Sequence, residues 1–100
     1  MVKDAFLTIA IPTFNRRDRV TSLVESILRQ LEPDDELIVI DDGSPDGTAQ
    51  IVRDLKHQHP TSLFLEERRG KMGLGTAYIY GFKWAIERGY AFIFEMDADF

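Results

Sequence analysis

The sequence predicts an α/β domain built on a mostly parallel sheet with flanking helices. Short apolar runs rich in β-branched residues alternate along the chain with longer segments whose apolar residues recur every three or four positions. The apolar runs are continuous, as expected for parallel strands that are covered on both faces. The resulting order of strand, helix, strand, helix, strand, helix, strand places the helices in right-handed crossovers.

Four runs are the expected strands. The first covers residues 6–11 and is closed by Pro12, and the second covers residues 36–40 and is closed by the turn sequence DDGSPDG. Residues 90–96 form a third clear run, and residues 62–66 form a weaker one between them. The four runs are separated by segments long enough for one helix each, which fits parallel pairing.

Three segments have the spacing of helices with one apolar face. The first stops before Pro33, the second follows capping chemistry at residues 44–46, and the third has Gly89 as its C-terminal cap. The residues predicted to point inward are Val20, Leu23, Val24, Ile27, Leu28 and Leu31 in the first helix, Ile51, Val52 and Leu55 in the second, and Leu74, Ala77, Tyr78, Gly81, Phe82, Ala85 and Ile86 in the third.

The composition narrows the classes of function. The chain has 100 residues, which suits one domain over residues 1–100, and a formal net charge of −5, which argues against a nucleic-acid partner. It has no cysteine, so disulfides and thiolate chemistry are excluded. No apolar stretch approaches the roughly 18 residues that span a bilayer, and the N-terminal sequence is a poor signal peptide. A cytoplasmic location with at most peripheral membrane contact is predicted.

Ligands of such sheets bind beyond the carboxyl ends of the strands, where the segments PTFNR, DDGSPDG, ERRGKMG and DADF fall. Asp97 and Asp99 are spaced by one residue, which on an extended strand end places both carboxylates on one side. Such a pair can chelate a hard divalent cation such as Mg²⁺ or Mn²⁺. On pattern alone, a solvated strand end explains the same tripeptide equally well.

Asp41 and Asp42 follow the second predicted strand directly. Turn glycines and helix capping account for most of this segment. Two adjacent acids repel each other, so at least one of them is expected to have a partner, which is a hydroxyl, a base edge or a metal. Asp41 is therefore a candidate binding residue, with the structural explanation given equal weight.

A basic segment precedes the third helix and contains Arg68, Arg69 and Lys71. With the glycines that follow, it forms a small anion-binding setting. The segment does not match the phosphate-binding P-loop, because Gly75 is followed by Thr76 where that motif requires lysine, and it does not match the dinucleotide fingerprint. A solvated basic turn explains it equally well.

In this order, the segments IAIPTFN, ELIVIDDGSPDGT, GKMGLGTAYIYGFKWA and FEMDADF resemble the N-terminal half of the family 2 glycosyltransferases, most closely the dolichol-phosphate and polyprenol-phosphate mannosyltransferases. The resemblance spans essentially the whole chain. It implies a fold of the GT-A type, with a nucleotide-sugar donor, expected to be GDP-mannose, lying across the carboxyl ends of the strands. The implied acceptor is a polyprenyl or dolichyl phosphate, and single displacement would invert the anomeric centre.

The resemblance also implies the residues of the site. The residues implied to bind the nucleotide-sugar are Pro12, Phe14, Arg16, Val39, Asp41, Asp97, Ala98 and Asp99. Asp97 and Asp99 would hold Mg²⁺ or Mn²⁺ at the diphosphate, and Arg69 and Lys71 are candidate phosphate contacts. No catalytic residue is assigned beyond the metal ligands. Phe14 and Arg16 depart from the family, which usually has Tyr and Glu at these positions.

Relatives of this kind continue beyond the paired aspartates into an acceptor-binding half. The chain is therefore expected to be the donor half, truncated after the DxD motif, and to lack transferase activity alone. Two alternatives stay open. One is a family 2 glycosyltransferase with a saccharide acceptor, and the other is a non-catalytic fragment that binds a nucleotide-sugar.

Overall fold

A computed structural model describes residues 7–69, 74–87, 89 and 92–95 of the chain. The elements are, in chain order, β1 (Leu7–Thr13), α1 (Arg17–Leu28), β2 (Glu36–Asp41), α2 (Thr48–Gln58), β3 (Leu63–Glu67), α3 (Leu74–Glu87) and β4 (Phe92–Glu95). The four strands form one parallel sheet in the order β3-β2-β1-β4. The predicted α/β class and the predicted order of elements are confirmed.

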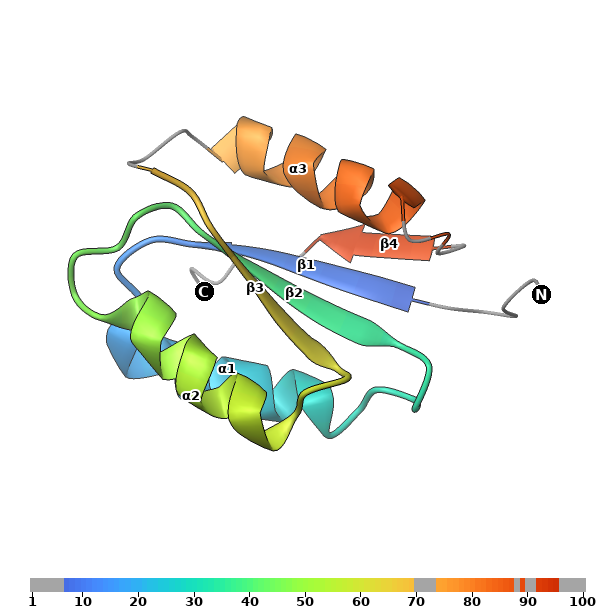
Figure 1. The fold of residues 1–100 in the computed structure, drawn as a ribbon, viewed down its shortest axis with the longest axis horizontal. Coiled ribbons are helices and arrows are strands. Elements are labelled where there is room, and N and C mark those ends of the chain that lie inside the picture. The colour runs from blue at the N-terminus through green and yellow to red at the C-terminus, as the bar shows by residue number, and fades with distance from the viewer. Residues whose placement is uncertain (1–6, 70–73, 88, 90–91, 96–100) are drawn as a thin grey trace.

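The sheet lies between two layers of helices. Figure 1 shows α1 and α2 on one face of the sheet and α3 on the other. The crossovers through α1 and α2 run in one direction across the sheet, whereas the crossover through α3 returns past β2 and β1 to reach β4. Since all these crossovers are right-handed, the reversal of direction places α3 on the opposite face.

Both faces of the strands are apolar, which explains the continuous runs in the sequence. Successive strand residues point to opposite faces. Towards α1 and α2 the buried strand residues are Ile9, Ile11, Leu37, Val39 and Leu63, and towards α3 they are Ala10, Ile38 and Ile40. Few strand positions can therefore take a polar side chain, and most polar side chains lie near the ends of the strands.

β1 extends two residues further at its C-terminal end than the sequence predicts. Pro12 does not close the strand but pairs with Ile40, and Thr13 pairs with Asp41. The described pairing of β1 with β4 ends at Ala10, so the missing N–H group of Pro12 interrupts none of the described ladder on that side. The longer strand brings the following loop level with the end of β2.

The predicted buried face of α3 is partly right. The small residues Ala77, Gly81 and Ala85 are buried, as predicted. The prediction is wrong for Phe82 and Ile86, which are 43% and 74% exposed. Within the described part of the chain, neither α3 nor any other helix has the combination of length and hydrophobicity that a membrane crossing needs.

A buried carboxylate explains how α3 is turned. Glu36, at the start of β2, is 1% exposed and accepts hydrogen bonds from Trp84 Nε1 at 3.0 Å and from Thr8 Oγ1 at 3.4 Å. The Trp84 ring also packs at a tilt against Phe64, with ring centroids 5.6 Å apart. Because a buried acidic group requires hydrogen-bond partners, the indole is directed to the sheet, and the opposite side of α3 is left exposed.

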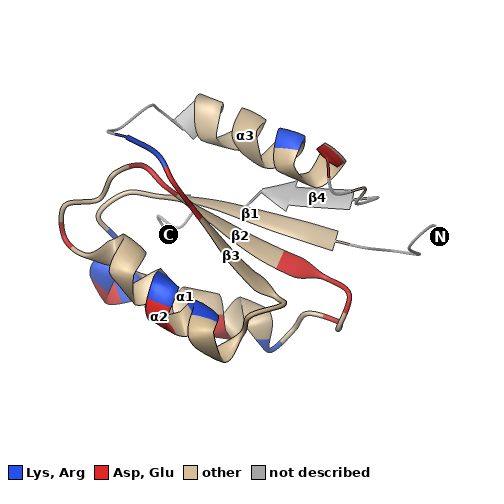
Figure 2. Ribbon diagram, in the orientation of Figure 1, with Lys and Arg blue, Asp and Glu red and all other residues tan. Residues whose placement is uncertain are grey.

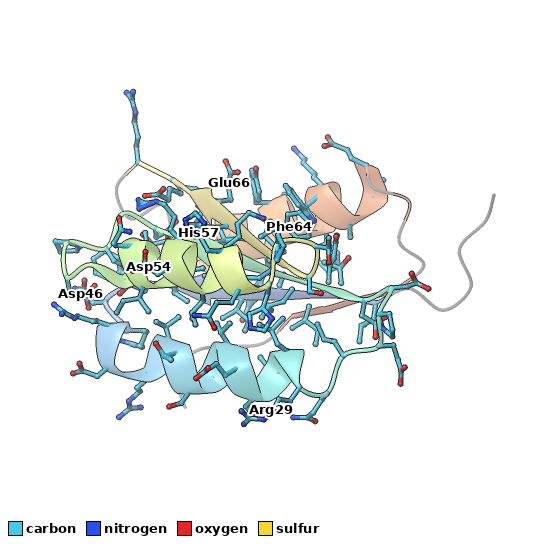
Figure 3. The ribbon with its side chains drawn as sticks, turned by 60° about the horizontal axis from the view of Figure 1, so that its bottom comes forward. Arg29, Asp46, Asp54, His57, Phe64 and Glu66 are labelled. Atoms are coloured by element: carbon cyan, nitrogen blue, oxygen red, sulfur yellow. The ribbon has the colours of Figure 1, made fainter. Side chains whose placement is uncertain are left out.

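A second polar contact joins β3 to α3. Figure 3 shows Phe64 and Glu66 on β3, alongside α3. Burial and a hydrogen bond with the Glu66 carboxylate raise the pKa of Tyr80 on α3 to about 12. The neutral hydroxyl is therefore retained throughout the physiological range.

The outer edge of β3 is occupied by a side chain from α2. Since Leu37 N–H donates to Ser62 O, the carbonyl of the next residue, Leu63, points away from β2. Lys56 Nζ donates to Leu63 O at 2.8 Å and lies 4.4 Å from the centroid of the Phe64 ring. The Lys56 ammonium group thus satisfies the Leu63 carbonyl, a backbone acceptor on the edge strand β3.

The Trp84→Phe variant should be less stable than the wild type by about 1–3 kcal/mol, because the buried Glu36 carboxylate loses a donor. Urea denaturation followed by circular dichroism measures the difference. Lys83→Ala is the matched control, since Lys83 is the exposed neighbour on the same helix, and it should change the free energy of unfolding by less than about 0.5 kcal/mol. Equal stability of Trp84→Phe and the wild type would show that the indole bond contributes nothing.

Candidate functional site

The side of the sheet at which the carboxyl ends of the strands lie, here called the carboxyl edge, has the layout of a ligand site. β1 leads into α1 on one face, while β4, the neighbour of β1, is reached from α3 on the other face. The order of the strands therefore reverses at β1. In open parallel sheets, ligands bind in the crevice at such a reversal, beyond the carboxyl ends of the strands. The described loops at this edge follow β1, β2 and β3.

Among the described residues, Asp41 is the most deeply buried acid at this end of the sheet. It is 1% exposed. Its Oδ1 atom accepts hydrogen bonds from Thr13 Oγ1 at 3.2 Å and from Ser44 Oγ at 2.6 Å, and its Oδ2 atom accepts the Ser44 N–H at 2.9 Å. A carboxylate has about four lone-pair positions, so these donors leave about one of them unused.

Ser44 also ties the loop after β1 to the loop after β2. Its hydroxyl oxygen accepts the Asn15 N–H at 2.8 Å while the hydroxyl donates to Asp41. Asn15 has a φ of 55°, in the left-handed region that asparagine tolerates better than most residues. The turn at Asn15 is therefore held by the Ser44 hydroxyl, which is itself fixed by its bond to the buried Asp41 carboxylate.

Asp46 and Thr48 make a second link between the same loops. Thr48 Oγ1 accepts the Arg16 N–H at 3.1 Å and donates to Asp46 Oδ1 at 2.5 Å, while Asp46 Oδ2 accepts the Arg17 N–H at 3.2 Å. Figure 3 shows Asp46 near the first turn of α1. The N-cap position of α2 is Gly47, with a φ of 91°, which has no side chain to act as a cap. Of the residues predicted to supply capping chemistry, 44–46, Asp46 does so, because its Oδ1 atom accepts the Thr48 N–H at 3.0 Å.

These bonds affect the ionisation of Asp46. Burial acts to raise its pKa, but hydrogen bonds from the Thr48 hydroxyl and from the Thr48 and Arg17 backbone N–H groups outweigh burial and hold the pKa below its ordinary value. The ionised carboxylate thus stabilises the link between the loops.

Asp42 faces the other way and pairs with Arg68. Arg68 Nε lies 2.6 Å and Nη2 lies 2.5 Å from Asp42 Oδ1, and both side chains are buried, at 8% and 9% exposure. Figure 2 shows the acidic carboxyl end of β3 passing into a basic segment before α3. Within that segment the charge of Arg68 is balanced inside the protein, whereas Arg69 is exposed. The prediction that one of the two adjacent acids has a partner is satisfied by both.

The other predicted site residues divide into three groups. Pro12, Phe14 and Arg16 lie together at the end of β1, on the same edge as Asp41. Val39 is fully buried in the core beneath α1 and α2. The residues outside the described part of the chain are Lys71, Asp97, Ala98 and Asp99. The roles of all these residues in binding stay predictions.

Some residues at this end of the sheet are not predicted from the sequence. Thr13, Ser44 and Thr48 supply the hydroxyl groups that organise it, and only Ser44 carries a local signal, as a turn residue after DDG. Among the residues that the structure describes, no group of three or more His, Cys, Asp or Glu side chains could hold a metal ion. An open pocket of about 250 Å³ at the start of α1 is lined by Asn15, Arg16, Arg17, Asp18, Arg19 and Asp46.

The parallel sheet with helices on both faces is a fold of the GT-A type. The model of glycosyl transferase family 2 matches residues 8–100, and the chain belongs to that family. It is 40% identical over 91 residues to the polyprenol monophosphomannose synthase of Mycolicibacterium smegmatis and 44% identical over 93 residues to the undecaprenyl-phosphate mannosyltransferase of Micrococcus luteus.

These matches cover 91% and 93% of this chain but only 34% and 37% of the two enzymes. The chain thus spans about a third of the length of these relatives. Among solved structures, the mannosyltransferase PcManGT from Pyrobaculum calidifontis, in complex with GDP-Man and Mn²⁺, superposes with a TM-score of 0.73 at 29% identity. That match covers 79% of this chain and 24% of the solved one.

The Asp46→Asn variant should destabilise the protein in a pH-dependent way. Because the folded-state pKa of Asp46 lies below its ordinary value of 3.8, the carboxylate stabilises the fold above that value and loses this effect as the pH falls through the folded-state pKa. Urea denaturation measures the difference in the free energy of unfolding between wild type and variant. This difference should be largest near about pH 6 and should decrease below about pH 4. A difference that stays constant across this range would contradict the assignment.

Proposed function

We propose that this chain is the donor-binding part of a metal-dependent glycosyltransferase that transfers mannose from GDP-mannose to a polyprenyl phosphate, with inversion at the anomeric carbon. The observation that carries the proposal is the placement of Asp41, a buried carboxylate at the carboxyl end of β2 beside the loop that follows β1. Nucleotides bind at this edge of open parallel sheets. The names of the relatives suggest the sugar and the lipid class.

Asp41 suits the nucleoside end of the donor. With three hydrogen bonds from Thr13 and Ser44, its carboxylate has about one lone-pair position left for a ribose hydroxyl or a guanine N–H. Hydrogen bonds to an ionised acceptor are stronger than neutral ones. Phe14 and Arg16 would border the nucleoside from the loop after β1. Val39 is fully buried between β1 and β3, so it would support the site from the core.

The acceptor needs no strong general base. The second pKa of a phosphate monoester is about 6, so the attacking oxygen of a polyprenyl phosphate is already largely ionised at neutral pH. As this oxygen bonds to the anomeric carbon, the bond from that carbon to the diphosphate oxygen breaks, and GDP leaves with the negative charge. The protein has to orient the donor and stabilise this charge. We assign Arg69 and Lys71 to the phosphates.

Asp97 and Asp99 are assigned as ligands of a Mg²⁺ or Mn²⁺ ion. The fit rests on the chemistry of the donors, because two carboxylates that follow β4, the strand beside β1, are hard oxygen ligands of the kind these cations prefer. When bound, the cation would supply Lewis-acid stabilisation of the departing diphosphate. Both aspartates lie outside the described residues.

Mn²⁺ is expected to strengthen the binding of GDP and GDP-mannose to this chain by about tenfold or more, which corresponds to about 1.4 kcal/mol. Isothermal titration calorimetry with and without the metal measures the gain. Asp99→Ala should abolish the gain by removing a ligand, while Asp54→Ala, at an exposed position on α2, should keep it. A folded wild-type sample whose nucleotide binding is indifferent to Mn²⁺ would count against the proposal.

A chimera tests the acceptor class. This chain replaces the matching N-terminal third of the Mycolicibacterium smegmatis synthase, and the chimera is expected to transfer mannose from GDP-mannose to polyprenyl phosphate. Asp99→Ala in the same chimera should lower the rate by about 100-fold or more, the scale of losing one group that stabilises transition-state charge. Transfer to a saccharide but not to the lipid phosphate would refute the acceptor, and a folded chimera inactive with both would refute the transferase.

A further inference from the structure

Arg68 lies where β2, β3 and α3 meet. Its guanidinium contacts Asp42 through Nε and Nη2, and its Nη1 atom donates to Thr76 Oγ1, in the first turn of α3, at 3.1 Å. Its backbone N–H donates to Asp41 O at 2.8 Å. One residue therefore joins the ends of two strands to the start of the third helix.

The pair of Asp42 and Arg68 is also connected to β1. The Asp42 N–H donates to Thr13 O at 3.0 Å, so the backbone of Asp42 is held by β1 while its carboxylate is held by Arg68. Asp42 stands between Asp41 and Ser44, the two residues that bond to each other across this turn. Fixing both the backbone and the side chain of Asp42 fixes the turn.

Arg68 is poorly placed to bind a phosphate itself. Its side chain is 8% exposed, and three of its nitrogen atoms are directed to Asp42 and Thr76. A guanidinium balanced by a buried carboxylate has little net charge to offer a diphosphate. The side chain of the neighbouring Arg69 is exposed.

We infer that Arg68 is a positioning residue for the nucleoside end of the donor. Paired with Asp42, it holds the loop after β2 so that Thr13 and Ser44 present the Asp41 carboxylate in one orientation. Arg68 touches neither the nucleoside nor the diphosphate. The inference rests on the proposed function, and it separates two adjacent arginines by role, with Arg68 acting through Asp41 and Arg69 assigned to the phosphates.

Comparing guanosine with GDP tests the distinction, because guanosine lacks the phosphates. If Arg68 acts through Asp41, Arg68→Met should weaken the binding of guanosine and of GDP by the same factor, about tenfold. Arg69→Met should weaken GDP binding while leaving guanosine binding unchanged. Arg53→Met is the matched control, since Arg53 forms an ion pair with Glu67 at the surface, with side chains 42% and 47% exposed, and it should change neither affinity.

Arg68→Met leaves Asp42 buried without its counter-charge, which can prevent folding. The double variant Asp42→Asn/Arg68→Met removes both charges and is expected to fold, as judged by cooperative urea unfolding. It should show the same parallel loss of guanosine and GDP affinity. The loss should not exceed that of a folded single variant, because the two side chains act as one unit.

Wild-type affinity for guanosine in the folded double variant would overturn the inference. A loss confined to GDP would also overturn it, since that pattern marks a phosphate ligand. If the wild-type protein binds neither compound, the proposed function fails, and hydrogen exchange decides the role of Arg68. The double variant should then show faster exchange of the Ser44 amide, with the Ile38 amide in the middle of β2 unchanged. Unchanged Ser44 exchange would refute the positioning role.

Discussion

The pairing of β1 on both sides is the constraint on which this structure depends. Within the described residues, β1 pairs with β2 at six positions and with β4 at four. The crossovers through α1 and α2 run across the sheet in one direction, and the crossover through α3 runs in the other. Because crossovers between parallel strands are right-handed, the two directions place their helices on opposite faces of the sheet. The apolar character of β1 on both faces follows, and so does the divergence of the chain at its carboxyl end. The candidate site lies at this end of β1, where ligands of open parallel sheets bind.

The carboxyl edge is organised by hydroxyl groups that act in the same way twice. A hydroxyl can accept one hydrogen bond and donate another. In each case a backbone N–H of the loop after β1 donates to a hydroxyl that lies between the end of β2 and the first residue of α2, and that hydroxyl donates to an aspartate. The two relays are Asn15 to Ser44 to Asp41, and Arg16 to Thr48 to Asp46.

Both relays hold an ionised or ionisable oxygen in a fixed direction before any ligand arrives. Pre-orientation of this kind reduces the ordering cost of binding. The same relays account for the sequence DDGSPDGT, in which acidic and hydroxyl residues alternate with glycines. Asp42 is the exception among these acids, since its partner comes from the end of β3 rather than from a hydroxyl.

The sequence supports the class of fold and the location of the site for local reasons. Apolar runs and helical spacing are properties of neighbouring residues, and the carboxyl ends of parallel strands share one edge whatever their partners. Partners that are distant in the chain leave no such trace. Trp84 bonds to Glu36 across 48 positions, and Arg68 bonds to Asp42 across 26. The rotation of α3, with Phe82 outward, depends on the first of these pairs, so spacing alone misplaces it.

The ammonium group of Lys56 lies against the exposed edge of β3. Unpaired backbone groups on an edge strand are a template for strands of other molecules, and a charge placed there opposes such pairing. A strand that approached β3 would have to displace Lys56 from Leu63 O and strip water from the freed cation. Lys56 therefore opposes edge-to-edge pairing of β3 with another strand. Because Lys56 lies on α2, the residues next to it in the sequence do not indicate this role.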